Sequence, residues 1–329
     1  MKWAGKCQMN SAPIVAAYGH LFPNLHIERD VLDRAGLQLV DANRCSDDEL
    51  VALGACGILL GAFQKLDRAR LTRLSTCKGV VRVGIGVDNI DLQAAKEAQI
   101  TICNVPSYCI EEVAVHVLTC SLALMRGLSY WDRSVRSGSW RGKRLPLLRR
   151  PSTCTLGIIG FGQIGKVLED RASRIFGSIV IYDPLYQNGS QTVGPRTEFV
   201  ANLDELLRRA DVASVHVPLT SETKDMLGEP QLRTMKTGAF VINASRGGII
   251  NVPALLRVIR EGHLAGAALD TFTKEPLPAD DELLSENRIL LSPHIAWKSE
   301  EAETELRRSS AEEMVRILTG GTPRSPIKI

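Results

Sequence analysis

The sequence predicts an α/β protein of two domains, each with a parallel β-sheet covered by helices. Three observations support this prediction. Short apolar runs of strand type alternate with segments of helical spacing, the chain of 329 residues has the length of two ordinary domains, and the alternation is broken at Asn104–Tyr108. With 44% hydrophobic and 23% charged residues, the composition is that of a globular protein.

The charge and cysteine content narrow the class of protein. A net charge of +3 gives only a weak positive field, which does not predict a nucleic-acid partner. The eight cysteines lack a Cys-x-x-Cys pair or a Cys/His cluster, so we expect reduced thiols and no metal site. No apolar run reaches about 18 residues and no signal-type N-terminus is present. We therefore expect a soluble, cytoplasmic protein without a membrane partner.

The first domain is predicted from Pro13 to about Cys103, with Ser46 and Asp91 placed as helix N-caps. The expected strands are Ile14–Tyr18, Leu37–Val40, Cys56–Leu60, Val80–Val83 and Ile100–Cys103. The expected helices are Leu25–Ala35, Asp47–Leu53, Asp67–Leu74 and Leu92–Ala98. Five parallel strands in this rhythm favour a flavodoxin-like fold. The glycine-containing loop after the fourth strand can direct backbone N–H groups at an anion, although a plain turn is the commoner explanation.

The second domain begins at a glycine-rich turn. The apolar run Thr155–Ile159 leads directly into Gly160-x-Gly162-x-x-Gly165, and a helical pattern follows at once. Gly160 permits the tight turn, Gly162 lets the backbone approach a pyrophosphate, and Gly165 allows close packing of helix on strand. The N-terminus of the helix attracts an anion. The motif predicts a dinucleotide site, and an ordinary glycine turn is the alternative.

The next expected strand ends in Asp183, whose carboxylate can accept hydrogen bonds from both hydroxyls of an adenosine ribose. The alternative is a turn-forming aspartate, since Pro184 follows it. No arginine follows Asp183 to neutralise a 2′-phosphate, and we therefore expect NAD rather than NADP.

The second domain contains six expected strands, which match a doubly wound sheet of order 3-2-1-4-5-6. They are Thr155–Ile159, Ile179–Tyr182, Val212–His216, Ala239–Asn243, Ala265–Leu269 and Ile289–Leu291. The last segment, Ser299–Leu318, is predicted to form a long helix with an acidic first turn. Because no strand follows it, this helix can pack back on the first domain.

Three charged side chains follow the last three of these strands. Arg246, Glu275 and His294 are expected at the carboxyl edge of the sheet, where such folds bind ligands. Hydride transfer to a ketone builds negative charge on the carbonyl oxygen and needs a proton donor. His294 fits that donor, Glu275 favours its protonated form, and Arg246 fits a bidentate carboxylate clamp. The alternatives are a strand-end salt bridge and a capping histidine. His116, on an apolar helix, is interpreted as a core residue.

These segments together resemble the D-isomer-specific 2-hydroxyacid dehydrogenases, and most closely their C-terminal-binding-protein-like branch. The resemblance covers about residues 55–320 and rests on the segments Arg82–Asp91, Asn104–Pro106, the glycine turn, Asn243–Gly248, Ala267–Asp270, Glu275-Pro276 and Pro293–Trp297. It implies an NAD-dependent oxidoreductase that interconverts 2-hydroxy and 2-oxo acids.

The resemblance also implies residue roles. Arg246 would bind the substrate carboxylate and carbonyl, and His294 with Glu275 would be the general acid and base. Ile85 and Gly86 would bind the carboxylate through their N–H groups, with Arg82 and Trp297 near the substrate. The expected NAD-binding residues are Gly160, Gly162, Gln163, Ile164, Gly165, Asp183, Val217, Pro218, Ala244 and Asp270, the last of which would hold the nicotinamide amide.

The resemblance further implies how the chain is divided. A Rossmann NAD-binding domain, residues 109–298, would be inserted in a flavodoxin-like substrate domain made of residues 1–108 and 299–329. A homodimer is the expected assembly.

Two features narrow the expected substrate. Gly61 and Ala62 stand where phosphoglycerate dehydrogenases of the superfamily carry an arginine, which disfavours a phosphorylated substrate. Glu275 stands where formate dehydrogenase relatives carry glutamine. We expect a non-phosphorylated 2-oxo acid. The alternative function is an NAD(H)-sensing co-repressor or scaffold, for which residues 13–60 give no clear peptide-binding groove.

Overall fold

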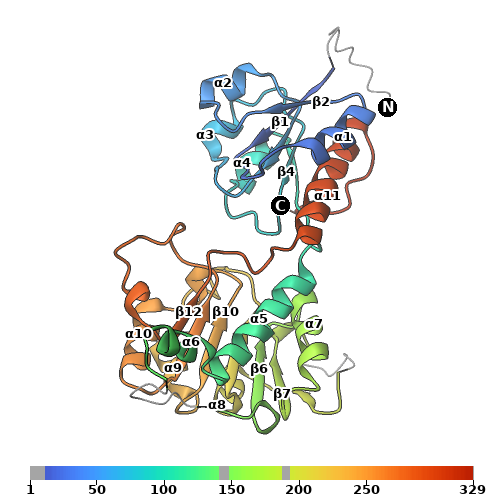
Figure 1. The fold of residues 1–329 in the computed structure, drawn as a ribbon. Coiled ribbons are helices and arrows are strands. Elements are labelled where there is room, and N and C mark those ends of the chain that lie inside the picture. The colour runs from blue at the N-terminus through green and yellow to red at the C-terminus, as the bar shows by residue number, and fades with distance from the viewer. Residues whose placement is uncertain (1–11, 141–147, 187–192, 329) are drawn as a thin grey trace. The chain divides into compact units, whose positions relative to one another are not determined.

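The computed structural model describes residues 12–140, 148–186 and 193–328. The chain divides into two compact units (Figure 1), unit 1 formed by Met1–Cys109 with Ser299–Ile329, and unit 2 formed by Ile110–Lys298. The boundaries expected from the sequence lie within one residue of this division.

Unit 1 is a five-stranded parallel sheet with helices on it. Its elements are β1 (Ile14–Tyr18), α1 (His26–Arg34), β2 (Gln38–Asp41), α2 (Asp47–Ala52), β3 (Gly57–Leu60), α3 (Arg68–Leu71), β4 (Gly79–Arg82), α4 (Leu92–Glu97), β5 (Thr101–Cys103) and α11 (Glu300–Thr319). The strand order β2-β1-β3-β4-β5 is the flavodoxin-like order that the sequence predicted. Ser46 and Asp91 cap α2 and α4 as expected.

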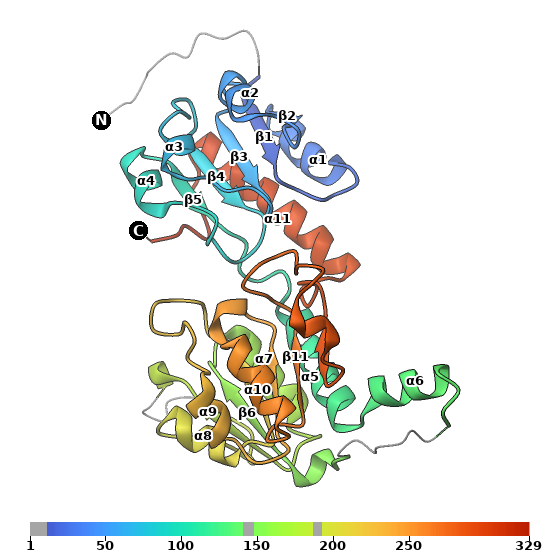
Figure 2. The same ribbon diagram turned by 90° about the vertical axis from the view of Figure 1, so that its left-hand side faces the viewer.

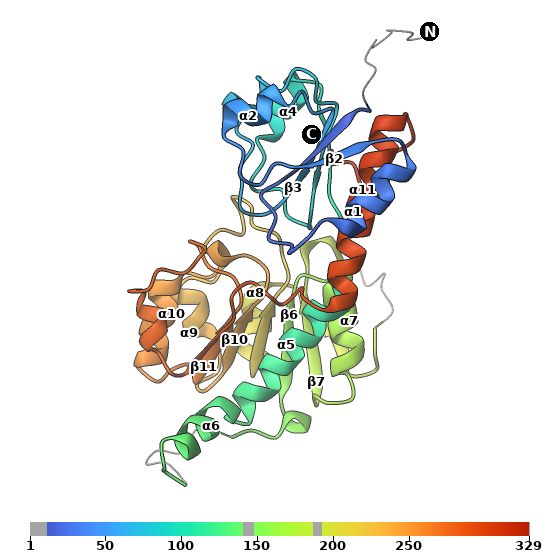
Figure 3. The ribbon, with the colours of Figure 1, turned by 45° about the horizontal axis from the view of Figure 1, so that its top comes forward.

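The C-terminal helix α11 belongs to unit 1, where it lies beside α1 and against the sheet (Figures 2 and 3). Two glycines of the sheet allow this close approach. A β-carbon on Gly57 would overlap the side chain of Met314, and one on Gly79 would lie 2.6 Å from Cγ2 of Ile317. The expectation that this helix packs on the first domain is therefore confirmed.

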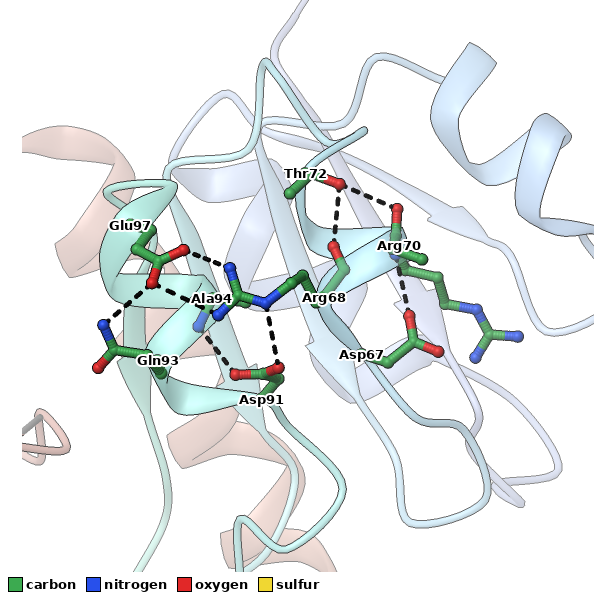
Figure 4. A network of polar contacts seen from close by, with 9 residues as sticks. Asp67, Arg68, Arg70, Thr72, Asp91, Gln93, Ala94 and Glu97 are labelled. Carbon is green, nitrogen blue, oxygen red and sulfur yellow. Dashed lines mark hydrogen bonds and ion pairs between the residues drawn. The ribbon is translucent and has the colours of Figure 1, made fainter.

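Figure 4 shows a surface network that joins α3 to α4. Asp67 caps α3 through the N–H of Arg70, and Arg68 forms ion pairs with Glu97 and Asp91. Exposed ion pairs of this kind contribute little stability individually. Their effect is local, since Asp91 also caps α4 and so fixes the end of the loop that follows β4.

Unit 2 is a seven-stranded parallel sheet with helices on both faces. Its strands are β6 (Thr155–Ile159), β7 (Ser178–Tyr182), β8 (Thr197–Phe199), β9 (Val212–Val215), β10 (Phe240–Asn243), β11 (Gly266–Leu269) and β12 (Ile289–Leu291). Its helices are α5 (Ile110–Met125), α6 (Leu128–Arg136), α7 (Gln163–Ala172), α8 (Leu203–Arg209), α9 (Glu229–Thr234) and α10 (Val252–Arg260), with short 3-10 turns at Pro151–Thr153, Pro184–Tyr186, Gly247–Ile249 and Glu282–Ser285.

Successive residues of β6 enter different cores, as expected for a sheet covered on both faces. Ile159 packs in one core with residues of α8, α9 and α10, and Ile158 packs in the other with residues of α5 and α7.

The sheet order β12-β11-β10-β9-β6-β7-β8 corrects the strand prediction in one respect. A short strand, β8, was missed, and it occupies the edge position next to β7. The strand at Val212 was expected at this edge, next to β7, but it pairs with β6 on the side away from β7. The miss has a physical reason, because β8 has only three residues, Thr-Glu-Phe, none of them fully buried.

Helix α6 was also not predicted. Its N-cap is Gly127, which has a left-handed φ of 59°, and the helix lies away from the sheet of unit 2 (Figure 2). Along the described ranges, no single helix has the length and apolarity of a membrane span. The bent pair α5 and α6 passes that test on length and composition alone.

Candidate active site

The glycine turn between β6 and α7 has the geometry of a pyrophosphate cradle. Gly160 has a φ of +95°, and a β-carbon on Gly165 would lie 2.6 Å from the carbonyl oxygen of Gly160. A β-carbon on Gly162 would meet no protein atom within 4 Å, so the space in front of this residue is open. Gly162 caps α7 without a side-chain hydrogen bond, and the first N–H groups of the helix therefore face that space. These residues fit the pyrophosphate of NAD.

Asp183 follows β7 and faces the same turn. Its Oδ2 accepts the N–H of Phe161 at 2.7 Å, and its Oδ1 accepts the N–H of Leu185 at 2.9 Å. A carboxylate has about four acceptor positions. The side chain can therefore hold the glycine turn and still accept ribose hydroxyls, as the sequence predicted.

The loop after β10 carries Arg246 and is ordered by Asn243. The Asn243 amide donates to the carbonyl of Arg246 at 2.7 Å and accepts the N–H of Ser245 at 3.0 Å. A β-carbon on Gly247 would overlap the backbone of Phe272, so a glycine is needed where this loop meets the loop after β11. The Ser245 hydroxyl donates to the carbonyl of Val217 at 2.5 Å. This contact brings Ala244 and the expected NAD-binding residue Val217 to the same edge of the sheet.

His294 and Glu275 form the central pair of the site. The imidazole Nδ1 lies 2.7 Å from Oε2 of Glu275, whose Oε1 accepts the N–H of Phe272 at 2.8 Å. Burial raises the pKa of Glu275, but hydrogen bonds from His294 and Phe272 and the charges of His294 and Arg246 outweigh it and lower that pKa. Glu275 is therefore a hydrogen-bond acceptor, and Nδ1 of His294 carries the proton that it accepts. Nε2 of His294 takes no part in this pair.

The structure thus brings together Arg246, Glu275 and His294, as expected from their places after three neighbouring strands. Arg246 is close enough to lower the pKa of Glu275 by its charge, and its guanidinium also donates to the carbonyl of Ser245 at 2.8 Å.

Asp270, directly after β11, orders the loop after β12 that carries His294. Its buried carboxylate accepts the Ser292 hydroxyl at 2.6 Å, the N–H of Ile295 at 3.0 Å and the N–H of Ala296 at 2.9 Å. Its carbonyl accepts the N–H of His294 at 2.8 Å. The carboxylate thus has three donors on it and is 1% exposed, and the expected contact of Asp270 with the nicotinamide amide stays a prediction.

His116 corrects a prediction. We interpreted it as a core residue, but its partly exposed ring reaches from α5 to the loop of β12, with Nε2 at 3.3 Å from the Ser292 hydroxyl and 4.0 Å from Asp270 Oδ1. Sequence reasoning missed Ser292 altogether. The only signal was its position directly after a strand of the same edge.

Three expected substrate-binding residues, Arg82, Ile85 and Gly86, lie in unit 1 at the end of β4. Gly84 has a φ of +140° and packs against the Arg82 guanidinium. The Asn104 amide donates to the carbonyl of Ile85 at 2.7 Å. Among the described residues, no hydrogen bond uses the N–H of Ile85 or of Gly86, which is consistent with anion binding there. Trp297 belongs to unit 2.

The described ranges contain no group of three or more His, Cys, Asp or Glu side chains that could hold a metal ion. The seven cysteines in those ranges form no disulfide with one another.

Comparisons with known proteins place the chain in a family. Residues 118–296, more than half of the chain, match the family model of the D-isomer specific 2-hydroxyacid dehydrogenase, NAD binding domain. A glyoxylate reductase of Korarchaeum cryptofilum is 36% identical over 280 residues, which are 84% of this chain and 81% of that protein. A D-3-phosphoglycerate dehydrogenase of Archaeoglobus fulgidus is 32% identical over 303 residues, 91% of this chain but only 57% of that protein.

Among solved structures, a D-lactate dehydrogenase from Aquifex aeolicus complexed with NAD and lactic acid superposes with a TM-score of 0.82. It is 25% identical and covers 93% of this chain and 96% of its own. The chain belongs to the D-isomer specific 2-hydroxyacid dehydrogenases, a family of NAD-dependent oxidoreductases. The predicted family, α/β fold and NAD cofactor are confirmed, and the C-terminal-binding-protein-like branch stays a prediction.

Proposed function

We propose that this protein is an NAD-dependent D-2-hydroxyacid dehydrogenase that reduces a non-phosphorylated 2-oxo acid. The observation that carries the proposal is the 2.7 Å contact between His294 Nδ1 and Glu275, beside Arg246 and on the same sheet edge as the glycine turn. An imidazole held in this way by a carboxylate is suited to general acid–base catalysis.

The chain's own residues perform the proton chemistry. NADH, when bound, supplies the hydride that adds to the carbonyl carbon. His294 donates the Nε2 proton to the carbonyl oxygen as negative charge develops there, and Glu275 stabilises the imidazolium that precedes this transfer. Arg246 holds the substrate carboxylate and carbonyl in line through its planar guanidinium. The product is a 2-hydroxy acid, and His294 regains its proton from solvent.

The test is NADH oxidation by wild type and His294→Ala with a panel of 2-oxo acids. Removing a general acid costs about 10²-fold or more in kcat. His26→Ala is the matched control, because His26 is an exposed histidine of unit 1 outside the site, and it should retain wild-type kcat. Equal rates in wild type and His294→Ala would remove the dehydrogenase proposal. NADH binding without turnover of any acid would favour the scaffold alternative.

The choice of a non-phosphorylated substrate is supported by Gly61, directly after β3. A β-carbon there would overlap the carbonyl of Gly19, so the backbone as it stands accepts no side chain at this position, cationic or other. Best turnover is expected within a group made of glyoxylate, pyruvate, hydroxypyruvate and branched 2-oxo acids. Preferred turnover of phosphohydroxypyruvate would contradict this expectation.

We also propose that the protein forms a homodimer. Helix α6 and the segment after it expose large apolar side chains, with Leu128 63% exposed, Val135 51% and Trp140 79%. Exposed apolar side chains along one segment support a contact with a second copy of the chain, and most soluble oligomers are symmetric. Light scattering should give a mass about twice the 36.0 kDa of the chain, and Val135→Asp should reduce it to that of a monomer. A wild-type mass of one chain at micromolar concentration would exclude the dimer.

A further inference from the structure

The backbone at His294 is held in an uncommon conformation by Asp270. His294 has a φ of +55°, in the left-handed region that costs about 1–3 kcal/mol for a non-glycine residue. Its N–H donates to the carbonyl of Asp270 at 2.8 Å, and the next two N–H groups, of Ile295 and Ala296, donate to the carboxylate of the same residue. One aspartate therefore fixes three consecutive N–H groups of the loop.

The carboxylate of Asp270 is in turn held by a side chain from the loop that carries His294. Ser292 donates its hydroxyl proton to Oδ1 of Asp270 at 2.6 Å, a short distance typical of a charge-assisted hydrogen bond. Because that proton is committed to the carboxylate, the Ser292 oxygen is left as an acceptor.

His116 supplies the matching donor from another element. Its Nε2 lies 3.3 Å from the Ser292 oxygen, and the only proton left for this contact is the one on Nε2. His116 on α5 thus donates to Ser292 and Ser292 donates to Asp270, which also accepts the backbone N–H groups of the loop that carries His294.

We propose that His116 and Ser292 are positioning residues that act through Asp270 to hold the imidazole of His294 in line with the substrate. The inference rests on the proposed function, because it assigns His294 the role of general acid. Asp270 is buried, so removing the Ser292 hydroxyl leaves part of its carboxylate without a donor and frees it to move.

Amide hydrogen exchange tests the network without relying on turnover. Ser292→Ala should speed exchange at Ile295 and Ala296 by about tenfold or more, since their acceptor is no longer fixed. Ser121→Ala is the matched control, because Ser121 is a buried serine of α5 whose hydroxyl binds the carbonyl of Val117 at 2.7 Å. It should leave both amides unchanged. Unchanged exchange in Ser292→Ala would overturn the proposal.

Steady-state kinetics test what the network does for catalysis. Ser292→Ala should lower kcat by about 10- to 100-fold with little change in KM for the 2-oxo acid, because Arg246 is untouched. Ser292→Thr keeps the hydroxyl and should restore most of the rate. A kcat equal to wild type in Ser292→Ala, or an equal loss in Ser292→Thr, would contradict a positioning role.

A double-mutant cycle tests the order of the chain. His116→Leu should lower kcat and His116→Gln, which keeps a donor, should recover part of it. If His116 acts through Ser292, the double variant His116→Leu/Ser292→Ala should be no slower than Ser292→Ala within about twofold. If the losses in kcat of the two single variants multiply in the double variant, His116 does not act through Ser292. A wild type that turns over no 2-oxo acid, with the exchange result as expected, would remove the proposed function and not the network.

Discussion

At the scale of single residues, His216 shows how burial at the sheet edge lowers the pKa of a titratable side chain. It follows β9, directly before the expected NAD-binding residues Val217 and Pro218, and its Nε2 lies 2.8 Å from the Ser214 hydroxyl. Burial lowers the pKa of His216 to about 4. The ring is therefore neutral in the folded protein at pH values where a free histidine is charged.

This shift predicts a loss of stability in mild acid. Between pH 6.5 and 4 the unfolded chain takes up a proton at His216 that the folded protein does not, so the free energy of unfolding falls as the pH falls through this window. The loss attributable to this residue is at most about 3 kcal/mol, and smaller because His216 is partly exposed. Urea unfolding at pH 7.5 and pH 5 measures it. In His216→Gln the pH dependence should be smaller than in wild type, and an identical dependence would assign the acid sensitivity to other groups.

Residue roles could be predicted where a motif fixes them. Arg246, Glu275 and His294 were found because the ends of parallel strands meet at one edge, so that their neighbourhood follows from chain order alone. Ser292 and His116 were not found. Their contact depends on where α5 crosses the sheet, which is set by packing and leaves no local pattern in the sequence.

At the scale of elements, the turn between β6 and α7 contains two glycines with different surroundings, Gly165 packed against the backbone and Gly162 facing open space. Gly165→Ala places a β-carbon 2.6 Å from the carbonyl oxygen of Gly160 and should destabilise the fold by about 1–3 kcal/mol. Gly162→Ala meets no protein atom within 4 Å and has a φ of −72°, so its free energy of unfolding should stay within about 0.5 kcal/mol of wild type.

Gly162→Ala is predicted to weaken cofactor binding. The added methyl group of Gly162→Ala occupies the space expected for the pyrophosphate, and NADH affinity should fall by about tenfold or more, that is by at least about 1.4 kcal/mol. Fluorescence titration with NADH measures this loss, and Gly165→Ala provides the structural comparison. Undiminished affinity in Gly162→Ala would mean that the pyrophosphate does not pass in front of this residue.

Long, periodic elements were predicted well and short or marginal ones were not. Strand β6 has the predicted bounds, because a continuous apolar run leaves little freedom. Strand β8 lacks an apolar run, and α6 exposes its apolar residues rather than burying them. The strand forms by pairing with β7, and the helix begins after Gly127, whose left-handed backbone turns the chain between α5 and α6.

At the scale of the whole molecule, unit 1 is closed by residues from both ends of the chain. Arg307 of α11 is 3% exposed and Glu28 of α1 is 2% exposed. Two hydrogen bonds of 2.8 Å join them, and the guanidinium also donates to the Asn24 carbonyl and stacks on Phe22 at 4.7 Å. The N-terminal and C-terminal segments are thus tied by one bidentate ion pair.

This tie predicts a large effect of a single substitution. Arg307→Met leaves the carboxylate of Glu28 buried without its partner, and the free energy of unfolding of unit 1 should fall by about 3–5 kcal/mol. The exposed pair Arg136–Asp132, with side chains 77% and 55% exposed, provides the control. Arg136→Met should change stability by less than about 1 kcal/mol, because water already solvates both groups. Urea denaturation followed by circular dichroism compares the two variants.

Since the cost comes from an unpaired buried charge, Glu28→Leu added to Arg307→Met should recover part of the loss. A double variant as unstable as the sum of the singles would show that the packing of α11, and not the charge pair, holds the two ends of the chain together.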